Sequence, residues 1–164
     1  MVVLIVVILA GAAIPMLGAN GAGLDTAAAE VGNALRFALH ESRRTGGYVL
    51  VDAGTRPGHL LIVSSDAAAV RGSDVTDPIT KRAMDIDVAA SGFFGGVKVD
   101  AKFIAPGGTY SQLLIGPGPT PSFWAAQASA VMGALQPGSG IDLTLGSRTV
   151  TVAFDSGNGR VSVP

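Results

Sequence analysis

The sequence has no cysteine and few charged or aromatic side chains. Of its 164 residues, 14% are charged and 5% are aromatic. The lack of cysteine excludes disulfides, thiolate metal centres and thiol catalysis. The 11 basic residues nearly balance the 12 acidic ones, so the net charge of −1 creates no field that would attract nucleic acid. Hydrophobic residues make up 48% of the chain, which is enough to bury a core.

Charge is absent from the whole N-terminal stretch, because the first charged residue is Asp25. A helix of about 19 such residues at roughly 1.5 Å each is about 28 Å long, close to the thickness of the hydrocarbon layer of a membrane. Residues 1–24 are therefore predicted to form a membrane-spanning and assembly segment. Its candidate contact residues are Val2, Val3, Leu4, Ile5, Val6, Val7, Ile8, Leu9, Gly11, Ile14 and Pro15.

Two other interpretations fit this stretch less well. A signal peptide could be cleaved near Ala19 to Ala22, but it should open with positive charge and have a shorter apolar run. A soluble core helix should show a polar face, and this run has none. Gly11, Gly18, Gly21 and Gly23 surround Pro15, and small residues of this kind allow close helix packing in lipid.

From Leu24 onward the helical pattern becomes amphipathic. Apolar residues recur at helical spacing between polar ones, and the double glycine Gly46-Gly47 after Arg43-Arg44 predicts the helix end. Residues 25–46 are thus predicted to continue the same helix. The residues expected to pack it onto a sheet are Val31, Leu35, Ala38 and Leu39.

Residues 47–164 show a period of two, which is typical of half-buried strands. Strands are predicted at 48–52, 59–64, 84–88, 97–103, 110–115, 141–145, 148–154 and 160–163, with a polar connection over 65–82. The last three form an antiparallel meander. Segment 123–135 is ambiguous, because its alanine-rich middle is compatible with a short helix and its alternation fits a strand poorly. The predicted fold class is α+β, with a long N-terminal helix packed on an antiparallel β-sheet domain.

These features together resemble the type IV pilin and type II secretion pseudopilin superfamily. The resemblance rests first on Val2 to Pro15, an apolar helix with a central proline that passes directly into an amphipathic half. Residues 34–46 are similar to the helix end of minor pseudopilins of the H type, and segments 114–119 and 150–161 are similar to their terminal strands. The specific part of the resemblance is limited to about the first 45 residues.

The resemblance implies a non-enzymatic subunit that assembles through its N-terminal helix into a filament or filament tip. Its partners would be other pilin-like subunits, inner-membrane lipid and secreted cargo, and its β domain would be periplasmic or extracellular in a bacterium. The family also has a processing glycine, a methylated residue and a glutamate that sets subunit register. Aligned on Pro15, these positions would precede Met1, so no residue here takes their roles.

Sites for chemistry were also considered, and no catalytic, cofactor-binding or metal-binding residue is predicted. His40 or His59 with Ser64, Ser65 and Asp66 would make a hydrolytic triad, but no Gly-x-Ser-x-Gly elbow is present. Gly116-Pro117-Gly118 lacks the lysine of a phosphate-binding loop and is predicted to be a turn.

Two acidic pairs are candidate cation ligands. Asp85 and Asp87 are expected to lie on a solvated strand face opposite Lys98 and Lys102. Asp74 and Asp77, in the longest loop, lack the spacing of an EF-hand.

A different class of function stays open at this point, namely an anchored or exported β-domain binding module that remains monomeric. Four aromatic residues near predicted loops would then form either core or a partner-facing patch. They are Phe93, Phe94, Phe123 and Trp124.

Overall fold

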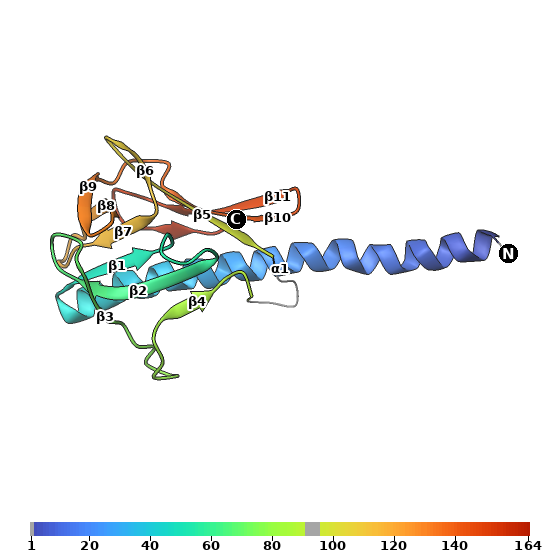
Figure 1. Cartoon of the computed structure of the whole chain (residues 1–164), viewed down its shortest axis with the longest axis horizontal. Coiled ribbons are helices and arrows are strands. Elements are labelled where there is room, and N and C mark those ends of the chain that lie inside the picture. Colours follow the sequence, from blue (N-terminus) through green and yellow to red (C-terminus); the bar gives the residue numbers. More distant parts are fainter. Residues whose placement is uncertain (1, 91–95) are drawn as a thin grey trace.

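The computed structural model describes residues 2–90 and 96–164, and the side chains of residues 21–90 and 96–164. The chain forms one long N-terminal helix followed by strands, and residues 21–45 of the helix pack against antiparallel β-sheets (Figure 1). The fold class is therefore α+β. The elements are α1 (Val2–Thr45), β1 (Tyr48–Asp52), β2 (His59–Ser65), β3 (Arg71–Asp74), β4 (Asp85–Asp87), β5 (Lys98–Ala105), β6 (Gly108–Tyr110), β7 (Gln112–Ile115), β8 (Phe123–Gln127), β9 (Ala130–Ala134), β10 (Gly140–Leu145), β11 (Arg148–Phe154) and β12 (Val161–Ser162).

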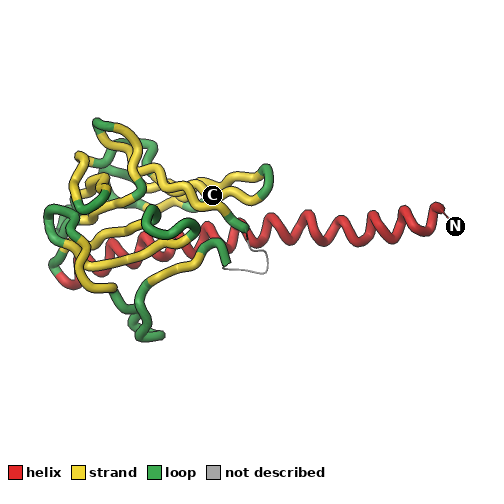
Figure 2. Tube along the Cα trace, viewed as in Figure 1, coloured by secondary structure: helices red, strands yellow, loops and turns green. Residues whose placement is uncertain are grey.

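The strands form two sheets. The first has the order β3-β2-β1-β7-β8-β9, with β4 also paired to β2, and the second has the order β12-β11-β10-β5-β6. Figure 2 shows both sheets gathered around the C-terminal half of the helix, while its N-terminal part extends away from them. The C-terminal half of α1 contacts strands of both sheets, so it joins them into one core.

The helix continues without a break through Asp25 and Thr26, because neither residue acts as a cap there. It ends where Gly46 adopts a φ of 64°, a left-handed conformation that glycine accepts without steric cost. Ser42, which is fully buried, secures this end by donating a hydrogen bond of 2.8 Å to the Gly47 carbonyl.

Several predicted strands differ in the structure. The segment 110–115 is divided at Ser111, so that β6 belongs to the second sheet and β7 to the first. The ambiguous segment 123–135 is not helical but forms the β8–β9 hairpin. The connection over 65–82 contains a further strand, β3. These differences arise because pairing with the neighbouring strand decides the structure where the local pattern is weak.

The strands β3 and β4 share one edge of β2, and the chain between them leaves the sheet. We call residues 75–84 the finger (at the bottom of Figure 1). Both of its ends are hydrogen-bonded to Ile62, through the amide of Val75 (3.1 Å) and the carbonyl of Met84 (2.9 Å). A bridge between Thr76 and Ala83 then closes it. The finger is thus an ordered projection, and Ile79 near its tip is 88% exposed.

Candidate functional site beside helix α1

The described half of α1 has one buried and one exposed face. The predicted packing residues Val31, Leu35 and Ala38 are fully buried, and Leu39 is 8% exposed. All four lie in the core cluster that also contains Ile141 and Leu143 of the second sheet and Val51 of the first. This face holds the helix to the domain, so a partner that contacts this half of α1 must bind to the exposed face of the helix.

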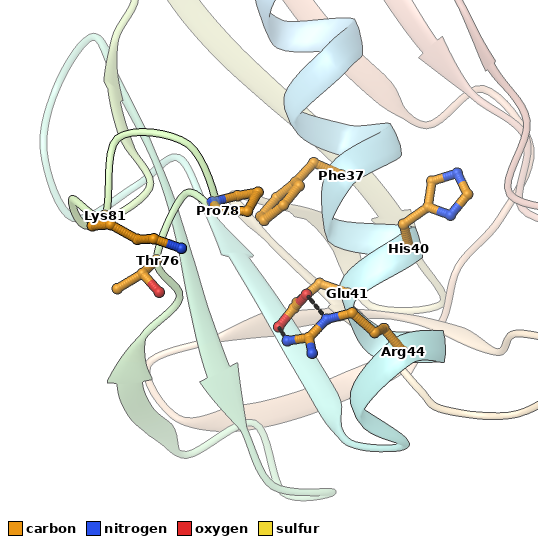
Figure 3. A pocket seen from close by; sticks show the side chains of 7 residues that line it. All are labelled: Phe37, His40, Glu41, Arg44, Thr76, Pro78 and Lys81. Carbon is orange, nitrogen blue, oxygen red and sulfur yellow. Dashed lines mark hydrogen bonds and ion pairs between the residues drawn. The ribbon is translucent and has the colours of Figure 1, made fainter.

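Two clefts lie between α1 and the finger, one on either side of Phe37. The first has a volume of about 560 Å³ and is lined by Phe37, His40, Glu41, Arg44, Thr76, Pro78 and Lys81. In Figure 3, Pro78 of the finger faces the ring of Phe37 across this cleft. The floor is therefore apolar, whereas basic side chains from both walls surround it.

Glu41 is the acidic side chain in the first cleft, and it is already neutralised. Arg44 donates two hydrogen bonds to its carboxylate, of 2.8 and 2.6 Å (dashed lines in Figure 3). These hydrogen bonds hold the pKa of Glu41 below its usual range. Because Arg44 and Glu41 neutralise each other, Lys81 gives this cleft its basic character.

The second cleft, of about 540 Å³, has the opposite charge. It is lined by Glu30, Asn33, Ala34, Phe37, Asp77, Thr80, Arg82, Ala83, Met84, Asp85, Ile86 and Asp87. Four of these residues are acidic and one is basic. Oε2 of Glu30 is buried and has no hydrogen-bond partner within the part of the chain that the structure describes. The groove beside α1 is therefore basic near the C-terminal end of the helix and acidic nearer its middle.

The prediction that Asp85 and Asp87 face Lys98 and Lys102 is wrong. β4 pairs with β2, not with β5. Asp85 accepts hydrogen bonds from Arg56 (2.9 Å) and pairs with Nδ1 of His59 (2.8 Å), and Asp87 lies 3.7 Å from the other ring nitrogen of that histidine. Lys102 instead pairs with Asp142 on β10, because β5 and β10 are neighbours in the second sheet.

The side chains of the hydrolytic triad weighed from the sequence do not meet. His59 is bound to Asp85, whereas Ser64 bonds to Ser73. Asp66 accepts the amides of Ala68 and Val70, both at 2.9 Å. His40 is exposed on α1 and lines the first cleft.

The acidic loop residues and the aromatic candidates also have local roles. Asp74 pairs with Arg71 (3.0 Å), and Asp77 accepts the amide of Ile79 (2.7 Å). Within the described residues, no group of three or more histidine or acidic side chains is placed to hold a metal ion. Phe123 is buried against Phe154 and Trp124 lies near Tyr48, whereas Phe93 and Phe94 lie outside the described residues.

The candidate assembly residues from Val2 to Pro15 lie outside the residues whose side chains are described. Among the described residues, no helix has both the length and the apolar character that crossing a membrane requires. Glu30 was not singled out from the sequence, because its environment depends on the finger, which lies more than 40 positions further along the chain.

Comparison with known proteins adds no relative: no family model, no curated protein and no solved structure matches the chain. The structure itself is consistent with a pilin-like fold, since an N-terminal helix packs on antiparallel β-sheets.

Proposed function

We propose that this chain is a non-enzymatic pilin-like subunit, a pseudopilin or minor pilin, that assembles through its N-terminal helix into a filament or filament tip. The observation that carries the proposal is the division of α1 into two halves. The first half bears no charge before Asp25, and the second half is tied to both sheets by a fully buried face. A helix of this kind joins an apolar segment to a folded domain without a linker.

In this proposal the apolar half of α1 lies in lipid before assembly and against other helices after it. As a monomer it would be stored in the bacterial inner membrane, where its backbone bonds are satisfied within the helix. In the filament the same residues would pack against the helices of other pilin-like subunits. The β domain, held outside the membrane, would face the neighbouring domains and any secreted cargo.

The absence of cysteine allows a direct test by cross-linking. Single cysteines are introduced along the apolar half, one position at a time from Val2 to Ile14, and the full chain is oxidised in its native membrane. Helices that pack side by side in a filament should give disulfide-linked dimers at positions that recur every 3.6 residues or so. Thr149→Cys, at an exposed position of β11, is the matched control and should stay monomeric.

The alternative of a monomeric binding module predicts a different outcome. In that case no position of the apolar half cross-links above the level of Thr149→Cys, and the chain extracted in detergent is a monodisperse monomer. That result would overturn the proposed assembly. The two clefts beside α1 would then be the first place to look for a ligand.

A further inference from the structure

Glu30 occupies an unfavourable position if the chain acts alone. Its half-buried side chain lines the second cleft, and its Oε2 is buried and accepts no hydrogen bond from the described residues. A buried carboxylate oxygen that has lost water and gained no donor lowers the stability of the fold. The neighbouring cleft, which opens beside it, leaves room for a donor from another molecule.

The other acidic side chains of this cleft already have donors. Asp85 is bound by Arg56 and His59, and Asp77 by the amide of Ile79. Asp87 accepts the amide of Ala90 at 2.9 Å. Arg82 lines the cleft but makes no hydrogen bond or ion pair with Glu30. The cleft thus keeps an excess of negative charge and one carboxylate oxygen without a donor among the described residues, which calls for a cationic donor.

The opposite flank of the same helix carries unpaired positive charge. Arg36 makes no ion pair within the described part of the chain; its guanidinium reaches from Asn33, at the rim of the second cleft, to β12, donating hydrogen bonds of 3.1 Å to Asn33 and 3.2 Å to the Val161 carbonyl. Arg43 follows seven residues later and is therefore on the same stripe of the helix. Its side chain is exposed and makes no ion pair or hydrogen bond with any described residue. The helix therefore has an acidic flank beside β4 and a basic flank beside β12.

We propose that Arg43 of one copy of this chain enters the second cleft of the next copy and hydrogen-bonds to Glu30. The inference rests on the proposed function, because it requires neighbouring helices that run parallel. Two different flanks meet in such a contact, so it is heterologous, and a stagger along the helix axis makes it extend as an open filament instead of closing into a ring. Arg43 lies thirteen residues after Glu30, so neighbours would be staggered by about 20 Å along the helix axis.

A zero-length carbodiimide cross-linker tests the contact, because it joins a carboxylate to a lysine amine that touches it. The full-length Arg43→Lys variant keeps the positive charge and supplies the amine. We expect a cross-linked peptide that joins Glu30 to position 43. Within one chain these positions are about 20 Å apart on a continuous helix, so such a link can form only between copies.

Two further variants serve as controls. Glu30→Gln combined with Arg43→Lys keeps the shape of the side chain but removes the reactive carboxylate, and the link should disappear. Arg43→Glu should lower the yield of assembled chain about ten-fold, and adding Glu30→Arg should restore it, because the swap re-forms the pair. Arg43 is exposed, so its substitution does not disturb the folded core.

The outcomes separate this contact from the proposed function. If cysteines in the apolar half cross-link but Glu30 does not join position 43, the contact is overturned and assembly through the helix stands. A link from Glu30 to a lysine elsewhere in another copy also overturns the assignment to Arg43. If neither kind of cross-link forms, both proposals fail.

Discussion

Asp52 shows how a single charged residue is accommodated in the interior of this domain. It is 2% exposed, at the end of β1. Its Oδ1 accepts the amides of Gly54 (2.9 Å) and Thr55 (3.1 Å), and its Oδ2 accepts the Thr55 hydroxyl. Burial raises the pKa of Asp52, but hydrogen bonds from Thr55, Gly54 and Gln112 outweigh that effect, and the pKa lies below its usual value.

This shift predicts how the Asp52→Asn variant behaves with pH. Because the pKa is lower in the folded state, the ionised carboxylate stabilises the fold above about pH 4, and this stabilisation is lost as the pH falls through the folded pKa. The variant should therefore be less stable than the parent at pH 7, by about 1–3 kcal/mol, and the difference should shrink at pH 3. Urea unfolding at both pH values measures it.

The control for this prediction is Asp66→Asn, at an exposed turn where the carboxylate likewise accepts two backbone amides. It should change stability less at pH 7. A deficit of Asp52→Asn that stays constant from pH 7 to pH 3 would contradict the role given to its ionised form.

For single residues, the sequence predicted which side chains of the helix are buried, but not which polar atoms lack a hydrogen-bond partner. Apolar spacing alone indicated that Val31, Leu35 and Ala38 face the sheets, because a 3.6-residue period maps directly onto a helix face. The environments of Glu30 and Asp85 depend on which strand lies opposite. That pairing is non-local, and the local alternation of charges does not determine it.

Among the elements, the β8–β9 hairpin turns in an unusual way. Its two loop residues, Ala128 and Ser129, have φ values of 48° and 63°. Two-residue hairpin loops with positive φ at both positions favour Asn-Gly, and a residue such as alanine is strained there. The hairpin is therefore held in register by its strands, which pair from Trp124 to Gln127, against the preference of its turn.

Replacing the turn with the favoured pair, Ala128→Asn with Ser129→Gly, should stabilise the protein. We expect a gain of about 1 kcal/mol, which corresponds to a rise in Tm of about 2–4 °C for a domain of this size. Differential scanning calorimetry measures it. Ala68→Gly, at an exposed turn where φ is not positive, should instead lower the Tm. An unchanged or lower Tm in the double variant would show that the turn is not strained.

This hairpin was also the element that the sequence left ambiguous, and the reason is visible in its residues. Ala125, Ala126, Ala128, Ala130 and Ala134 have no strong preference for strands, so the local signal is weak. By contrast, β11 was predicted at its observed bounds, because Val150, Val152 and Phe154 alternate with exposed residues. Elements that bury β-branched or aromatic side chains on one face are the ones that the sequence predicts well.

The whole molecule joins an apolar helix to a lightly charged domain, and its proposed behaviour depends on the apolar half remaining free of charge. The charge of the chain is confined to residues from Asp25 onward. Placing one charged side chain at the centre of a membrane helix costs about 2.5–3.5 kcal/mol. A single substitution there should therefore change where the protein is found.

We predict that Ile8→Lys reduces the share of full-length protein that stays in the membrane fraction after alkaline washing. Thr149→Lys adds the same charge to an exposed strand position and should leave that share unchanged. Immunoblots of the washed pellet and the supernatant give the measurement. Equal retention of both variants would mean that the apolar half does not hold the protein in the membrane.

The turn between β10 and β11 reaches along α1 to the point where the helix leaves the domain. There Arg148 pairs with Asp25 at 2.9 Å, and its guanidinium lies so close to Gly21 that a Cβ at that position would be 2.7 Å from Nη1. Under the proposed function, this contact would set how deep the helix enters a membrane. The residues before Gly21, about 30 Å of helix, would lie in apolar surroundings, and the domain would meet the membrane surface at that point. A longer or shorter hairpin at this place would then change the depth of insertion.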